Sequence, residues 1–151
     1  MMENSWLSRI KALYDAYLLT AAELEKNRRF GDGILGLRPG PADDPCHQRF
    51  AAELEALLRE CAAEASSAEA AEILRLLFDK ADDKRMPLSA YWMLIAVQGL
   101  GHELIGLLSP EDAAGLLAFY RKRYPRRVRL PVQDQILKQL KLQAETTEAS
   151  S

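Results

Sequence analysis

The longest apolar stretch of the chain, Leu88 to Leu108, is the feature that most constrains its fold. Read as a helix, this stretch is apolar almost all round, so neighbouring elements must cover it on most sides. Gln98, His102 and Glu103 interrupt it and leave an uncharged run shorter than the ~20 residues that a bilayer span needs. We therefore expect the central helix of a bundle, and no membrane helix.

Five further segments carry apolar residues at helical spacing, and no segment alternates as a strand would. Asp43 or Asp44 ahead of Pro45, Ser109 ahead of Pro110, and Pro131 are all typical of helix starts. The sequence predicts an all-α, single-domain bundle of about six helices around the central one, arranged as antiparallel neighbours. The five segments run from Trp6 to Leu24, Cys46 to Cys61, Ala70 to Ala81, Ala113 to Tyr124 and Val132 to Leu140.

Length and composition are those of one ordinary globular domain. With 151 residues, 48% hydrophobic and 28% charged, the chain can bury a single core. We expect residues 1–142 to form this domain and residues 143–151 to be a polar, frayed tail. The N-terminal sequence MMENSWLSRI lacks the features of a secretory signal, which predicts a cytoplasmic protein.

Three glycines in the central segment call for an explanation. Gly99, Gly101 and Gly106 each cost ~1 kcal/mol relative to alanine in a helix interior. One alternative is a close crossing by another helix over Ala96, Gly99 and Gly106. The other is a break in the helix at Gly99 to Gly101.

The same segment carries three polar side chains that helical geometry places in one row. A rotation of about 100° per residue brings Tyr91, Gln98 and His102 to the same side. This row is either the solvent-facing edge of the helix, which is the favoured interpretation, or the lining of a polar pocket. The pocket would make the chain a small-molecule-binding protein or an enzyme in which His102 transfers protons. No catalytic residue and no cofactor is assigned on this evidence, and any ligand is unknown.

The long connection after the first helix holds most of the glycines and prolines of the chain. Gly31, Gly33 and Gly36 match the GxGxxG dinucleotide fingerprint, but a helix precedes them and prolines follow, so the required strand and helix are missing. We interpret the segment from Gly31 to Pro41 as a loop that takes part in binding.

Asp43, Asp44, Cys46 and His47 then offer oxygen, sulfur and nitrogen ligands within five positions. Zinc sites need three or four ligands at recognisable spacing, and the chain contains one other histidine and one other cysteine. A helix cap followed by a core cysteine explains the same residues, so no metal site is predicted, and Asp43, Asp44 and His47 remain candidates for binding by the loop. Cys46 and Cys61 lie on one apolar stripe and are expected to be buried free thiols.

The strongest local charge feature is a basic cluster near the C-terminus. Residues 111–151 carry 8 basic and 5 acidic residues, whereas residues 1–110 carry 12 and 17. The first three cations would end a helix, where its dipole favours them, but the last three approach the next helix start and need another partner. That partner would be acidic residues of the second and third helices, in the same chain or in a second copy. The cluster comprises Arg121, Lys122, Arg123, Arg126, Arg127 and Arg129. The candidate acidic partners are Glu53, Glu55, Glu60, Glu64, Glu69 and Glu72.

These observations favour a protein–protein interaction or adaptor module that uses the basic cluster and the glycine-proline loop, with a protein partner or self-association. Nucleic acid is a weaker expectation. The net charge is −2, and few aromatic residues besides Tyr120 and Tyr124 lie among the arginines.

Overall fold

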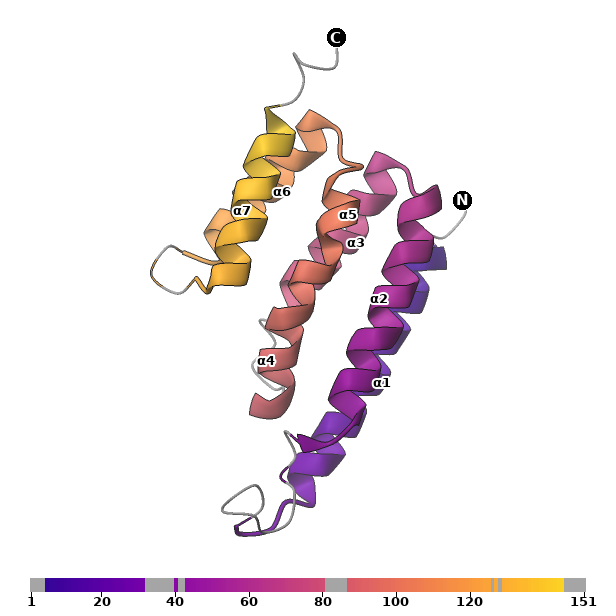
Figure 1. Cartoon of the computed structure of the whole chain (residues 1–151), viewed down its shortest axis with the longest axis vertical. Coiled ribbons are helices and arrows are strands. Elements are labelled where there is room, and N and C mark those ends of the chain that lie inside the picture. Colours follow the sequence, from indigo (N-terminus) through magenta and orange to yellow (C-terminus); the bar gives the residue numbers. More distant parts are fainter. Residues whose placement is uncertain are drawn as a thin grey trace.

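The computed structural model describes residues 5–31, 40, 43–80, 87–125, 127 and 129–145 (Figure 1). Within these residues all regular structure is helical, which confirms the predicted all-α bundle, with six helices of nine residues or more. The elements are α1 (Ser5–Lys26), α2 (Cys46–Glu64), α3 (Ser67–Lys80), α4 (Leu88–Ala96), the 3₁₀ helix η2 (Val97–Gly101), α5 (His102–Ile105), α6 (Pro110–Arg123) and α7 (Pro131–Ala144).

The helices form two layers of antiparallel neighbours. Figure 1 shows α2, the α4–α5 column and α7 in front, with α1, α3 and α6 behind them. The α4–α5 column lies between the α1–α2 and α6–α7 hairpins, and η2 packs against α2, α3 and α7. The central position expected for the segment from Leu88 to Leu108 is therefore confirmed.

That segment is not one continuous helix, because it tightens into η2 at the glycines. Of the two alternatives, the break is the one observed, although a close approach accompanies it. A Cβ atom on Gly101 would lie 2.7 Å from Leu74 Cδ2 of α3, whereas one on Gly99 would lie 3.2 Å from Val132 Cγ2 of α7. The absent side chain at Gly101 therefore lets η2 lie against α3.

The predicted helix starts at Pro110 and Pro131 are confirmed, whereas α2 begins at Cys46, one residue after Pro45. Ser109 Oγ accepts a hydrogen bond from the Asp112 amide at 3.1 Å and caps α6. Asp44 Oδ1 accepts from the Cys46 amide at 2.8 Å, which satisfies a free donor at the start of α2. At the other end of the chain α7 continues to Ala144, and Gln143 donates from Nε2 to the Leu108 carbonyl at 2.8 Å.

The core is formed by the inward stripes of all these helices, and its largest fully buried side chains include Tyr14, Phe78 and Tyr120. None of the described helices combines the length and apolar character that a membrane span requires.

Candidate interaction surface

The basic cluster lies at the end of the α6–α7 hairpin. We call its described members, Arg121, Lys122, Arg123, Arg127 and Arg129, the basic corner. Arg126 lies outside the described residues. Arg121, Lys122 and Arg123 form the last turn of α6, and Arg127 and Arg129 lie between α6 and α7.

Two of the arginines are tied to the fold. Arg123 forms an ion pair with Asp79 at the end of α3, and its guanidinium also lies 5.9 Å from the centre of the Phe119 ring. Arg129 Nη1 lies 3.8 Å from Asp134 Oδ1, and only 18% of its side chain is exposed. The prediction that Arg129 pairs with acids of the second and third helices was wrong. Asp134 lies much nearer, in the first turn of α7, where the helix dipole favours a negative charge.

Two of the acidic residues expected as partners pair with other arginines. Glu55 accepts from Arg59 Nη2 at 2.8 Å one turn away, and Glu60 lies 3.8 Å from Arg9 of α1. Both of these acids belong to α2, and neither pairs with a described cation of the basic corner.

The other cations of the basic corner point to solvent. Arg121, Lys122 and Arg127 are exposed, and none has an acidic partner within 4.0 Å among the residues that the structure describes. The described members of the corner are thus two anchored arginines and three exposed cations, and Arg121 and Lys122 of these cations lie in the last turn of α6.

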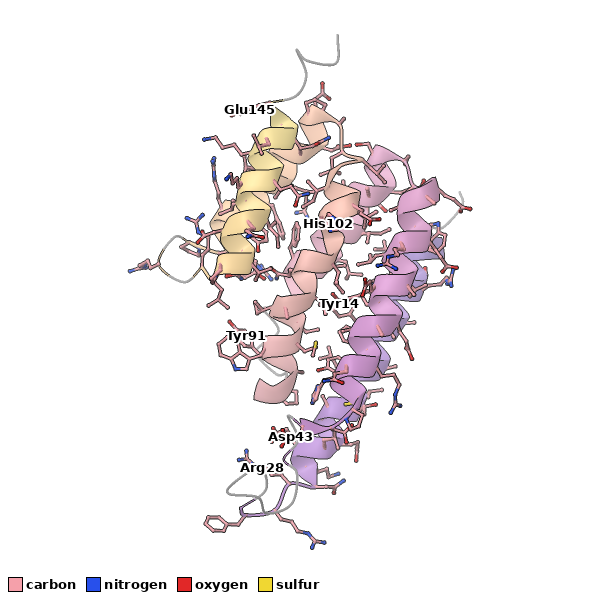
Figure 2. The ribbon with its side chains drawn as sticks, in the orientation of Figure 1. Tyr14, Arg28, Asp43, Tyr91, His102 and Glu145 are labelled. Atoms are coloured by element: carbon pink, nitrogen blue, oxygen red, sulfur yellow. The ribbon has the colours of Figure 1, made fainter. Side chains whose placement is uncertain are left out.

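An aromatic pair lies on α4, with Tyr91 half-buried and Trp92 exposed. The rings of Tyr91 and Trp92 meet edge to face at 5.2 Å, and Trp92 is 55% exposed. Figure 1 shows α4 extending beyond the end of the α6–α7 hairpin, and Figure 2 places Tyr91 on the side of α4 that faces the hairpin end. Nothing in the sequence-based expectations singled out Trp92, yet two adjacent aromatic residues on a helix point about 100° apart, so one of them readily faces outward.

In the described part of the chain, Tyr91, Gln98 and His102 do not together line either of the two hollows. Neither sequence-based alternative describes Gln98, which is fully buried. Its Oε1 accepts from the Tyr120 hydroxyl at 2.7 Å, and its Nε2 donates to the Tyr124 hydroxyl oxygen at 3.1 Å. The tighter winding of η2 and the packing of α6 separate Gln98 from the two neighbours that a regular helix would give it.

His102 is exposed and lines a hollow of about 210 Å³ between α2 and the η2–α5 segment. The floor is apolar, with Leu58, Leu100 and Leu104, and the rim carries the Glu55–Arg59 ion pair and Glu103. Neither Tyr91 nor Gln98 lines this hollow, so its single histidine has no second proton-transfer group of the expected row beside it.

The candidate binding residues at the start of α2, Asp43, Asp44 and His47, form hydrogen bonds within the fold. Asp43 Oδ2 accepts from the Gly40 amide at 2.9 Å, and the amide of Cys46 lowers the pKa of Asp44 by its hydrogen bond. His47 is buried, with Nδ1 2.5 Å from the Tyr17 hydroxyl. No group of three or more histidine, cysteine, aspartate or glutamate residues in the described part of the chain is arranged to hold a metal ion.

The rest of the glycine-proline loop, at 32–39 and 41–42, lies outside the described residues. A second hollow, of about 160 Å³, opens nearby between α1 and α2 beside Tyr17, Cys46 and Arg49. Cys46 and Cys61 are buried free thiols, as expected, and burial raises the pKa of each to about 11.

Comparison of the chain with protein-family models, with curated proteins and with solved structures finds no match.

Proposed function

We propose that the chain is a protein–protein interaction module whose basic corner binds an acidic surface of a partner protein. The observation that supports this most directly is the division of the corner into anchored and free cations. Arg123 and Arg129 are held by Asp79 and Asp134, while Arg121, Lys122 and Arg127 project from the same hairpin end.

Anchoring matters because a binding surface loses affinity when it must first be ordered. The last turn of α6 holds Arg121 and Lys122, and the Arg123–Asp79 ion pair ties that turn to α3. A partner would therefore meet Arg121 and Lys122 on a helical backbone that is already in place. Complementary charge of this kind raises the association rate and selects the partner.

An acidic protein fits this surface better than a nucleic acid does. Binding to a phosphate backbone depends on how many cations neutralise it, and two arginines of the corner are already engaged by carboxylates. Tyr120 and Tyr124, the aromatic residues among these arginines, are buried and offer no ring on which a base could stack.

The test is binding of the full chain to immobilised poly-L-glutamate and to single- and double-stranded oligonucleotides, at low and high salt. We expect retention on poly-L-glutamate that salt weakens, and its loss when Arg121, Lys122 and Arg127 are all changed to Glu. The matched control changes Lys11, Lys138 and Lys141 to Glu, since these exposed cations give the same change in charge elsewhere. Equal loss in both triple variants, or retention on the oligonucleotides alone, would overturn the proposal.

A further inference from the structure

The hollow beside His102 lies between two walls that the fold holds in place. One wall is α2, and the other is the η2–α5 segment, on which Figure 2 labels His102. Helix α7 holds the second wall, because Gln139 Nε2 donates to the His102 carbonyl at 3.0 Å and Gln143 Nε2 donates to the Leu108 carbonyl at 2.8 Å. All residues that line the hollow belong to the described part of the chain. A ligand would therefore meet a site that is already formed, which avoids the cost of ordering it.

The floor of the hollow is apolar, and its volume suits one small ring. Leu58 and Leu104 are 3% and 1% exposed, and the half-buried Leu100 completes this floor. The volume of about 210 Å³ exceeds the ~150 Å³ of an apolar cavity that holds benzene. An apolar group of about the size of benzene therefore fits.

The rim of the hollow carries an excess of negative charge. Glu55 and Arg59 neutralise each other, since Arg59 Nη2 lies 2.8 Å from Glu55 Oε1. Glu103 lines the same hollow, and none of the ion pairs among the described residues includes it. A hollow whose remaining charge has one sign attracts ligands of the opposite sign.

We propose that this hollow binds a small organic cation, namely a primary ammonium attached to an apolar group about the size of a benzene ring. The apolar group packs on the three leucines of the floor, and the ammonium pairs with the Glu103 carboxylate. Ligand sites commonly combine an apolar lining with a few polar groups that fix the orientation of the ligand. The inference is independent of the proposed function, because no residue of the basic corner lines this hollow.

An anion and a metal ion fit the hollow less well. An anion would need Arg59, whose guanidinium Glu55 already engages, and Glu103 would repel it. Mg²⁺ and Ca²⁺ are surrounded by oxygen ligands, whereas the floor here consists of leucines. An organic cation uses both the apolar floor and the Glu103 carboxylate.

The test is an NMR titration of the full chain with three probes that share one ring, which are benzylamine, benzyl alcohol and benzoate. It is run at about pH 8, where a primary amine keeps its proton and imidazole side chains are largely neutral. We expect benzylamine to shift the backbone amide signals of Gly99, Leu100 and Glu103 in a saturable way. Benzyl alcohol should bind about two- to fivefold more weakly, because it lacks the ion pair, and benzoate more weakly still.

Glu103→Gln should weaken the binding of benzylamine about two- to fivefold and leave that of benzyl alcohol unchanged, because the variant removes only the charge. Glu72→Gln is the matched control, since Glu72 is an exposed glutamate of α3 that lines neither hollow, and it should change neither affinity. Leu100→Trp places a larger side chain in the floor and should weaken the binding of both probes. Circular dichroism and a thermal melt check that the variants fold.

Three results would overturn the inference. The first is that the benzylamine shifts do not saturate, and the second is that benzoate binds as strongly as benzylamine. The third is that Glu103→Gln and Glu72→Gln weaken benzylamine binding equally, because the amine would then follow the net charge of the protein. If Leu100→Trp does not fold, the comparison of Glu103→Gln with Glu72→Gln still decides.

Discussion

Tyr120 donates its hydroxyl hydrogen to Gln98 Oε1 at 2.7 Å, at a point where neither side chain has any solvent exposure. The Gln98 amide then donates to Tyr124, whose hydroxyl donates to the Phe78 carbonyl at 2.5 Å. One chain of hydrogen bonds thus joins α3, η2 and α6 through the core. Groups buried in this way are costly to leave without a partner.

Gln98→Leu should lower the free energy of unfolding by ~1–3 kcal/mol, because the Tyr120 hydroxyl loses its buried acceptor. Urea unfolding measures the change. Tyr120→Phe in the same background removes that unsatisfied donor, so the double variant should be more stable than the two single effects together predict. Strict additivity would show that the two side chains do not depend on each other.

Gly101→Ala should destabilise the fold by ~1–3 kcal/mol, because the new methyl group would overlap the fully buried Leu74. Gly115 is the matched control in the exposed middle of α6, where a Cβ meets nothing within 4 Å. Gly115→Ala should stabilise the protein by ~0.5–1 kcal/mol through helix propensity. Thermal melts that shift in the same direction for both variants would contradict the close approach of η2 to α3.

Ser109→Ala should cost about 1 kcal/mol, since the Asp112 amide loses its cap at the start of α6. The comparison variant is Ser8→Ala on the exposed side of α1, where alanine has the higher helix propensity and little change is expected. Chemical unfolding of the two variants measures the difference. Equal effects would mean that the cap does not contribute to stability.

The two buried thiols predict a loss of stability in alkali. Burial raises the pKa of Cys46 and Cys61 from 9.0 to about 11, so in this window the unfolded chain loses protons that the folded chain keeps. The stabilisation that the neutral thiols provide is complete below pH 9.0 and disappears as the pH rises through about 11. The buried tyrosines, whose pKa values burial also raises, act in the same direction.

Urea midpoints measured across this pH range check the thiol contribution. The Cys46→Ala, Cys61→Ala variant should be less stable overall but should show a shallower decline than the parent. If stability fell equally steeply with pH in the parent and the variant, the thiols would have the same pKa in the folded and unfolded chains.

Much of the helical architecture could be predicted from local signals. Pro110 behind Ser109, Pro131 and the apolar spacing around Ile73 and Leu74 need only neighbouring residues to act, and each lies where expected. The buried cysteines follow from the same periodicity, because a stripe that faces the core carries all its members inward.

The candidate surface was predictable only in part. The basic corner is a run in the sequence, so its existence needed no structure, but its division into anchored and free cations depends on Asp79, which is 44 residues away from Arg123. The 55% exposure of Trp92 depends on which helices pack against α4, and no local pattern encodes that packing.

The sequence by itself determined the all-α class, the helix starts and the central place of the segment from Leu88 to Leu108, because caps, proline positions and apolar periodicity act within a few residues. Only the tertiary structure decided that this segment breaks at η2, that Gln98 lies buried between Tyr120 and Tyr124, and that Trp92 is exposed. The physical reason is that these outcomes come from packing between helices distant in the chain. The close approach of Leu74 in α3 to Gly101 in η2 is one such contact between distant parts of the chain.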